Sequence, residues 1–350
     1  MNDNLEPYIT QGEPEKVERS YIWHTAVGLQ QVDGLEPSEF LIKTANQNIN
    51  GNITLGEAQR LIEGYYQAHP VQADENRSEE ADKISARIAA ILAEKTFSFS
   101  PAEYIAIHRR LFEGIYKFAG KIRDWNISKS EWVLNGATVY YASAESIRDT
   151  LDYDFSQEKI FGYKGLSMRQ TAEHIARFVS GIWQIHAFGE GNTRTTAVFV
   201  IKYLRAFGFD VTNDIFAVNA WYFRNALVRA NYNDFKQGVH ATQEYLNCFF
   251  GNLLLGEKNE LRNRTLRVAV TNDIPVKAPQ NVPINVPAKL SANQQEILEL
   301  LKENGNVTAA RLAEKLGVAE KTVKRGFGVL KALGLIRRVG SNKTGRWEVL

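Results

Sequence analysis

The chain has 350 residues, of which 44% are hydrophobic and 23% charged, a composition that excludes disorder for most of its length and predicts about two or three domains. Its single cysteine, Cys248, excludes an intrachain disulfide framework and a cysteine-rich zinc site, and it favours a reducing, cytoplasmic compartment. No apolar run is long enough to span a membrane and the first residues lack the apolar core of a signal peptide, so we expect neither feature.

Charge is distributed unevenly along the chain. The net charge is +2, but residues 289–350 carry 12 Lys and Arg against 6 Asp and Glu, a net charge of +6. The preceding 288 residues therefore carry a net charge of −4. A basic tail on an acidic body predicts a separate module with a polyanionic partner.

The N-terminal region, residues 1–70, is expected to be a helical segment. Tyr21–Gln67 has the pattern of a helical hairpin. Thr54 and Glu57 have the spacing of a capping box, which predicts that an amphipathic helix begins there.

Residues 71–255 are predicted to form a mainly helical domain. Apolar residues of Thr171–His186 recur at i, i+3 and i+4, which predicts a helix with one buried face. Thr193–Phe207 is apolar almost all round, as expected of a central, buried helix. The only strand-like stretch, Trp132–Tyr141, contains Asn135-Gly136, which predicts a β-hairpin turn.

The next segment, residues 256–288, is predicted to be a linker. Four of the nine prolines of the chain fall within residues 273–288, where they block both helix and sheet ladders. Residues 289–350 then show the pattern of a helix, a helix–turn–helix and a hairpin. Thr308 and Gly317 mark the predicted start and end of the first helix of the helix–turn–helix.

The stretch that is most informative about chemistry is HAFGEGNTRTTAVF, residues 186–199. A short loop with glycines leads into a helix start, and backbone N–H groups in such a place favour an anion. Arg194 adds a planar charge suited to phosphate. Glu190 would oppose an anion unless a divalent cation, usually Mg²⁺, bridges it to the phosphates. His186 extends the apolar stripe at its end, so its ring is expected to point toward the loop.

This stretch resembles the motif of the Fic family, HxFx[D/E]GNGRxxR. The matching residues are His186, Phe188, Glu190, Gly191, Asn192 and Arg194. Gly120–Arg123 and Asn126–Lys129 are similar to the segment that leads into the flap hairpin of the family. The resemblance covers about Asp82–Leu255 and implies a mainly α fold, with a Fic-type helical core and a small β-hairpin flap.

The resemblance implies a protein adenylyltransferase that moves AMP from ATP to a Ser, Thr or Tyr hydroxyl of a target protein. His186 would be the general base and Glu190 would hold Mg²⁺ against the phosphates. The implied contacts to ATP and its phosphates are Gly189, Gly191, Asn192, Thr193, Arg194, Phe223 and Asn231. The implied flap, which aligns the target, comprises Val139, Tyr140 and Tyr141.

Two positions depart from the family pattern. Thr193 stands where the family usually has Gly, and Ala197 replaces the final Arg, which in the family binds the γ-phosphate. We therefore expect ATP to be held more weakly or differently. Doc-type relatives, which transfer phosphate instead, carry Lys at the position of Thr193. Because Thr is small and neutral, AMP transfer is favoured over phosphate transfer.

A transcription regulator whose Fic core senses a nucleotide is a further alternative. His186 beside Glu190 and Arg194 favours the enzyme, since a sensor would not need a base.

The N-terminal segment resembles the small antitoxin proteins that inhibit Fic toxins. The best fit to their [S/T]xxxE[G/N] motif is Asn46–Gly51, which puts Asn50 at the inhibitory Glu position. In the family that Glu pairs with the second motif Arg, whose place is taken here by Ala197. Because both charges are missing, a charge-based brake is not expected, and a steric brake by Asn50 remains a hypothesis.

The module at residues 289–350 resembles the winged helix-turn-helix family. The resemblance implies that its second helix enters the major groove of DNA. The implied DNA contacts are Lys321, Thr322, Lys324, Arg325, Lys343 and Arg346. A winged helix used for protein contacts is the alternative, and the sequence leaves open whether the chain forms a homo-oligomer.

Overall fold

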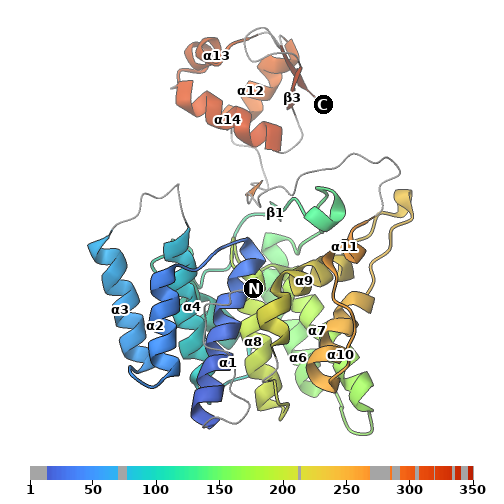
Figure 1. The fold of residues 1–350 in the computed structure, drawn as a ribbon. Helices are drawn as coiled ribbons and strands as arrows, with labels where there is room; N and C mark the ends of the chain where they lie inside the picture. Colours follow the sequence, from blue (N-terminus) through green and yellow to red (C-terminus); the bar gives the residue numbers. More distant parts are fainter. Residues whose placement is uncertain are drawn as a thin grey trace. The chain divides into compact units, whose positions relative to one another are not determined.

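The computed structural model describes residues 14–69, 77–211, 214–268, 284–285, 292–303, 307–318, 320–332, 336–339 and 346–349. The chain divides into two compact units, which are described separately below. The first comprises Met1–Arg123 and Ser130–Asn281, and the second comprises Asp124–Lys129 and Val282–Leu350. Figure 1 shows the helices that dominate both units, so the prediction of a mainly α protein is confirmed.

The N-terminal layer of the first unit contains three helices and a 3₁₀ helix. Their bounds are α1 (Pro14–Gly28), η1 (Leu29–Asp33), α2 (Glu39–Ile49) and α3 (Leu55–Ala68). The capping box predicted for Thr54 and Glu57 is present at the start of α3. At the start of α2, the side chain of Ser38 accepts a hydrogen bond from the backbone N–H of Leu41.

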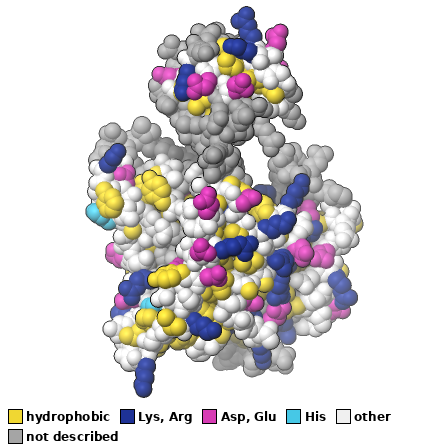
Figure 2. Space-filling model, turned by 180° about the vertical axis from the view of Figure 1, so that it is seen from behind, with side chains coloured by type: hydrophobic (Ala, Val, Ile, Leu, Met, Phe, Trp, Pro, Cys, Tyr) yellow, Lys and Arg dark blue, Asp and Glu magenta, His cyan; other side chains and the backbone are white. Residues whose placement is uncertain are grey.

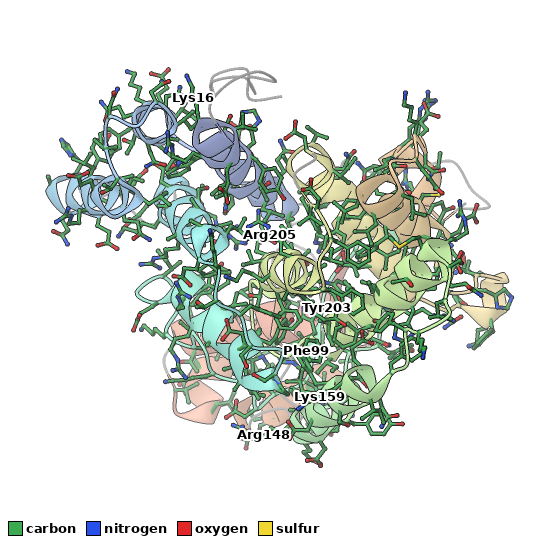
Figure 3. All side chains as sticks on the ribbon, turned by 90° about the horizontal axis from the view of Figure 1, so that it is seen from below. Lys16, Phe99, Arg148, Lys159, Tyr203 and Arg205 are labelled. Atoms are coloured by element: carbon green, nitrogen blue, oxygen red, sulfur yellow. The ribbon has the colours of Figure 1, made fainter. Side chains whose placement is uncertain are left out.

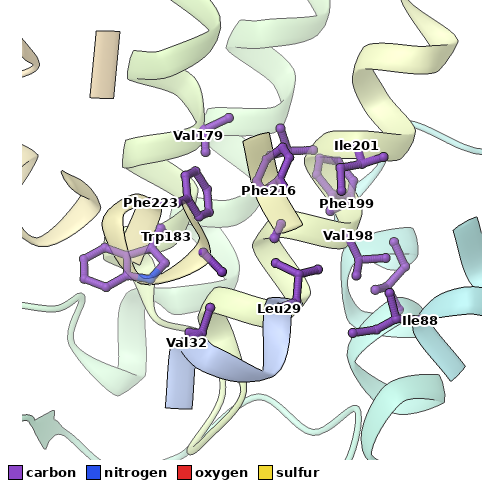
Figure 4. Close-up of a cluster of buried hydrophobic side chains, with 14 of the residues drawn as sticks. Leu29, Val32, Ile88, Val179, Trp183, Val198, Phe199, Ile201, Phe216 and Phe223 are labelled. Carbon is purple, nitrogen blue, oxygen red and sulfur yellow. The ribbon is translucent and has the colours of Figure 1, made fainter. Parts of the chain in front are cut away.

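The rest of the first unit is a bundle around one buried helix. Its helices are α4 (Ser78–Ala93), α5 (Pro101–Phe112), α6 (Ile147–Ile160), α7 (Met168–Ile185), α8 (Asn192–Ala206), α9 (Ile215–Ala230), α10 (Glu244–Leu255) and α11 (Asn263–Leu266). Every residue of α8 from Asn192 to Leu204 is buried, as the sequence predicts. Figure 4 shows Val198, Phe199 and Ile201 among buried side chains from α4, α7, α9 and η1.

Two cationic side chains of α8, the buried Lys202 and the partly buried Arg205, donate hydrogen bonds to the C-terminal end of the neighbouring helix α4. The ammonium group of Lys202 donates to the backbone oxygen of Ile91 at 3.1 Å, and the guanidinium group of Arg205 donates to that of Leu92 at 2.6 Å. Both carbonyl groups belong to the last turn of α4, which lacks the regular helical N–H partners, and that of Ile91 also accepts the backbone N–H of Glu94 at 3.3 Å. On the same helix, Tyr203 packs against Phe99, with 4.7 Å between the ring centroids (Figure 3).

The predicted flap hairpin does not form β-strands. Residues Trp132–Leu134 are a 3₁₀ helix, η2, and residues 137–143 belong to no helix or strand. The chain does reverse at Asn135-Gly136, where φ is 54° and 94°, and the backbone N–H of Glu131 donates to the oxygen of Ala137. The turn signal was therefore correct. The hairpin prediction was wrong because η2 replaces the first strand.

Two further 3₁₀ helices, η3 (Ala144–Ser146) and η4 (Phe235–Gln237), complete the first unit. Acidic and basic side chains are interspersed over the face seen in Figure 2. Among the described residues, no helix is long and apolar enough to cross a membrane.

The second unit contains a helical core and a two-stranded ladder. Its elements are α12 (Ala292–Glu303), α13 (Ala309–Leu316), α14 (Glu320–Ala332), β3 (Ile336–Val339) and β4 (Arg346–Val349), together with the antiparallel pair β1 (Ile127–Ser128) and β2 (Ile284–Asn285). Strand β3 pairs antiparallel with β4, with Ile336 opposite Val349. Thr308 caps α13 and Gly317 ends it with φ at 63°, as predicted.

The C-terminal end of α1 lies against α9 so closely that only glycine fits at position 28. A Cβ atom at Gly28 would lie 2.1 Å from the backbone oxygen of Ala217. We therefore predict that Gly28→Ala lowers the free energy of unfolding by about 2 kcal/mol or more, through overpacking. The control, Gly64→Ala in exposed α3, has nothing within 4 Å and should raise that free energy by about 0.5–1 kcal/mol. Equal urea midpoints for the two variants would contradict this packing.

Candidate active site

The loop between α7 and α8 begins with a left-handed residue that is not glycine. His186 ends α7 with φ at 51° and ψ at 56°, a conformation that costs roughly 1–2 kcal/mol for an L-residue. Arg123 holds this turn: its backbone N–H donates to the oxygen of Ala187 at 2.9 Å, and its Nε donates to the oxygen of His186 at 2.7 Å. Contacts from outside the loop therefore determine the turn. They come from Arg123, which the sequence analysis assigned only to the segment that precedes the flap.

The same guanidinium group joins α7 to the flap segment. It also donates to the backbone oxygens of Ile185, at 3.2 Å, and Ala142, at 2.5 Å. A cation at this place satisfies carbonyl groups at the end of α7 and complements the helix dipole. Burial lowers the pKa of Arg123 to about 10, so it remains charged at neutral pH.

The ring of His186 lies between the end of α7 and Tyr141. The ring is 3% exposed, and its Nδ1 lies 3.3 Å from the backbone oxygen of Trp183. Because a carbonyl oxygen can only accept, this contact assigns the proton to Nδ1 and leaves the lone pair on Nε2. On its other side the ring packs against that of Tyr141, with 4.1 Å between the centroids.

A second histidine, which the sequence analysis missed, fixes the middle of the loop. Nδ1 of His108 accepts the backbone N–H of Gly120 at 2.9 Å, so the proton is on Nε2, which donates to the backbone oxygen of Glu190 at 3.0 Å. The ring also stacks on Phe188, with 3.7 Å between the centroids. Burial lowers the pKa of His108 to about 3, so the ring stays neutral. Its role here is structural.

The remaining loop residues close the turn and open α8. Asn192 exchanges two hydrogen bonds with the backbone of Phe188, at 2.7 and 2.9 Å. Gly191 has φ at 75°, and a Cβ atom there would lie 2.3 Å from the ring of Phe112. Thr193, at the family's Gly position, accepts the indole N–H of Trp183 at 2.9 Å. The departure at Thr193 thus adds a bond between α7 and α8.

Arg194 is fully buried and lies among acidic side chains. Its Nε is 2.8 Å from a carboxylate oxygen of Asp33 in η1, and its NH2 is 2.8 Å from one of Glu80 in α4. Gln30 and Tyr116 also accept hydrogen bonds from it, at 3.1 and 3.2 Å. Burial by itself would raise the pKa of Glu80, but Arg194 and the other partners lower it below its ordinary value. In this conformation the positive charge of Arg194, which the sequence predicts to bind phosphate, is balanced by the carboxylates of Asp33 and Glu80.

The N-terminal layer contacts the motif through Asp33 and Gln30 of η1, whereas sequence analysis selected Asn50. Asn50 ends α2, is exposed, and lies at a helix end whose Ile49 oxygen accepts from Arg19 of α1. The sequence does hold a signal that could have found Asp33. Asp33-Gly34 is an acid followed by glycine, as in the second half of the inhibitory motif, whereas Asn50-Gly51 lacks the acid.

Two residues expected at the adenine base are structural in this conformation. Phe223 is 0% exposed and packs against Phe216 and Phe249, with 5.1 and 4.9 Å between the ring centroids. The amide group of Asn231 donates to Ser180, at 2.9 Å to Oγ and 3.3 Å to the backbone oxygen. The structure therefore places them in the core and at the end of α9. Phe223 lies in the apolar helix α9, where sequence alone does not distinguish a contact to a ligand from packing in the core.

Of the predicted flap residues, Tyr141 contacts the ring of His186 and Tyr140 is bound to α7. Gln184 of α7 donates to the backbone oxygen of Tyr140, whose side chain is 81% exposed, at 3.0 Å. Val139 is buried and Tyr141 covers His186. The side chain of Glu190 is partly buried.

A magnesium site of the expected kind needs few protein ligands. Mg²⁺ in nucleotide sites usually takes one or two carboxylates and completes its shell with phosphates and water. Among the described residues, no group of three or more His, Cys, Asp or Glu side chains could hold a metal by itself.

A cavity of about 610 Å³ lies apart from this loop, and the residues that line it come from α1, the end of α4 and the region around the end of α8. None of its lining residues belongs to the motif.

The structure describes only some of the residues that the sequence predicts to contact DNA. Thr322 and Lys324 of α14 are exposed, and Lys324 pairs with Glu320 at 2.8 Å. Lys343 lies outside the described residues, and the same is true of the side chains of Lys321, Arg325 and Arg346.

Comparison with known proteins confirms both family resemblances. Residues 98–204 match the Fic/DOC family, and residues 294–340 match the DeoR-like helix-turn-helix domain. The chain therefore contains a Fic/DOC domain and, after it, a DeoR-like helix-turn-helix domain.

A curated relative matches part of the chain. Over 108 residues the chain is 27% identical to protein adenylyltransferase VbhT of Bartonella schoenbuchensis, a match that covers 31% of this chain and 21% of that protein. The chain thus spans about a fifth of the length of that relative.

Two solved structures are similar to part of the chain. The N-terminal FIC domain of Bep8 from Bartonella sp. 1-1C is 17% identical with a TM-score of 0.40, and the match covers 53% of this chain and 88% of that one. BepC of Bartonella tribocorum with bound AMPPNP is 19% identical with a TM-score of 0.40, and it covers 51% and 87%.

The neutrality of His108 makes a testable contribution to stability. In the unfolded chain a histidine has a pKa near 6.5, whereas in the fold burial lowers that of His108 to about 3. Between these values only the unfolded state binds the proton, so this contribution is full above about pH 6.5 and falls by up to about 1.4 kcal/mol per pH unit below it. We predict that the stability advantage of the wild type over His108→Gln shrinks as the pH falls from about 7 to about 5 in urea unfolding. Parallel curves of the free energy of unfolding against pH for the wild type and His108→Gln would contradict this account.

Proposed function

We infer that this protein is a protein adenylyltransferase that moves AMP from ATP to a Ser, Thr or Tyr hydroxyl of a target protein. The observation that carries this proposal is the orientation of His186, whose Nδ1 faces a carbonyl oxygen so that Nε2 has the lone pair. The motif lies within a Fic/DOC domain, and the curated relative that the chain resembles is named as a protein adenylyltransferase.

In the proposed reaction Nε2 of His186 takes the proton of the acceptor hydroxyl. The hydroxyl oxygen forms a bond to the α-phosphorus, and the bond from that phosphorus to the oxygen that bridges to the β-phosphate breaks, releasing pyrophosphate. Backbone N–H groups at the start of α8, from Gly191 onward, would bind phosphate oxygens. Glu190 would hold Mg²⁺, which neutralises phosphate charge. In the proposal the flap residues Val139–Tyr141 align the target segment.

The carboxylates around Arg194 support an autoregulated enzyme. A triphosphate that approaches Arg194 meets Asp33 and Glu80, which are like charges at the same guanidinium group. Asp33 lies on the N-terminal layer and its side chain is 21% exposed, whereas that of Glu80 in α4 is 10% exposed, so in the proposal Asp33 is the carboxylate that withdraws. We propose that the inhibitory residue is Asp33 and that it acts through its charge. The sequence analysis had considered steric inhibition by Asn50.

The reaction is tested by incubating the protein with ATP labelled at the α- or the γ-phosphate. We expect the α-label to become attached to protein, and His186→Ala to abolish it, because the variant lacks the group that takes the hydroxyl proton. Transfer of the γ-label alone would instead support the Doc-like phosphotransferase. Attachment of neither label, with retained nucleotide binding, would support the nucleotide-sensing regulator.

A helix-turn-helix domain favours DNA as the partner of the second unit.

The brake is tested by Asp33→Asn. The substitution keeps the shape of the side chain and leaves Arg194 paired with Glu80, so the protein should fold and modify itself with AMP several-fold faster. The matched control is Asn50→Ala, which should leave the rate unchanged. If Asn50→Ala activates the enzyme and Asp33→Asn has no effect, the inhibitory residue is Asn50, as the sequence motif suggested, and this proposal is wrong.

A further inference from the structure

A buried ion pair lies behind the flap segment, apart from the motif. Glu131 and Arg224 of α9 face each other in two contacts, Arg224 NH1 to Glu131 Oε2 at 2.6 Å and NH2 to Oε1 at 3.2 Å. The side chains are 0% and 5% exposed. Buried pairs of this kind seldom repay the cost of desolvating both charges, so stability alone is a weak reason for this one.

Tyr141 connects this pair to the proposed base. Its hydroxyl group donates to Glu131 Oε1 at 3.2 Å, and its ring lies 4.1 Å from that of His186 at an interplanar angle of 37°. Burial first, and then the charge of Glu131, raise the pKa of Tyr141 well above 10. The phenol therefore keeps the proton that it donates, at any pH at which the protein is studied.

The two contacts of Arg224 give the pair a fixed direction. A guanidinium group that meets both oxygens of a carboxylate fixes the carboxylate plane, which a single ammonium group would not do. The carboxylate in turn sets where the tyrosine hydroxyl lies, and the tyrosine ring covers one face of the imidazole. Trp183 of α7 also restrains the imidazole of His186. Its backbone oxygen contacts Nδ1, and its indole ring lies 5.2 Å from the imidazole between centroids.

We propose that Arg224 and Glu131 are positioning residues that act through Tyr141 to hold the imidazole ring of His186 in its reactive orientation. This role rests on the proposed function of His186 as the base. It also connects the base to the N-terminal layer, because η1 packs on α9 and Asp33 adds to the charge that stabilises protonated Arg224.

Tyr141→Phe is the sharpest variant, because it keeps the ring and the ion pair and removes only the link between them. We expect kcat for AMP transfer to fall about three- to tenfold with KM for ATP unchanged, the size of effect that one hydrogen bond can exert. Arg224→Lys, which loses the two-point contact, should act in the same direction. The matched control is Tyr153→Phe on α6, where the ring is 63% exposed and the rate should not change.

A second readout does not depend on activity. In protein labelled with ¹⁵N-histidine, with the His186 signals assigned from His186→Ala, Tyr141→Phe should shift or broaden those signals while Tyr153→Phe leaves them in place. Unchanged His186 signals and unchanged kcat in Tyr141→Phe would overturn the positioning role. A raised KM for ATP at constant kcat would also overturn it, by showing that Tyr141 contacts the nucleotide. If the wild type transfers no AMP but its His186 signals respond to Tyr141→Phe, the proposed function fails and the positioning of the ring stands.

Discussion

The left-handed turn at His186 is the constraint on which the rest of the site depends. It ends α7, brings the imidazole to the mouth of α8, and lets Gly191 and Asn192 begin the next helix only a few residues later. An L-residue does not adopt this conformation without support. Arg123 supplies that support, with bonds to both sides of the turn. The reactive geometry is thus imposed on the loop by its surroundings.

The second determinant of the site is the charge around Arg194. Two carboxylates, an amide and a phenol surround one guanidinium group, so the motif and the N-terminal layer share a buried ion pair. Removing a partner from a buried pair costs several kcal/mol, whereas a charge-assisted bond from phosphate to Arg returns about 1.5–3 kcal/mol. These magnitudes are close enough that a bound nucleotide and Asp33 can compete for the same group. The autoregulation that we propose requires such a near balance.

Local patterns carried most of the fold. Periodicity and helix caps are informative because each is encoded within about 15 residues. They predicted the apolar stripe of α7, the uniformly apolar α8, the capping box at Thr54 and the turn of the helix-turn-helix. The misjudged features depend on contacts between distant segments. Asp33 meets Arg194 only after the bundle has formed, and Phe223 was assigned to a ligand although it packs in the core. Spacing within the sequence does not encode those distances, although Asp33-Gly34 does carry the acid–glycine pair of the inhibitory motif.

The most direct measurement is the intact mass of the purified protein after incubation with ATP and Mg²⁺, compared with that of His186→Ala. The account predicts that the wild-type chain gains the mass of one or more AMP groups and that the variant gains none. An unchanged mass for both proteins, or the same gain in the variant that lacks the imidazole, would contradict it.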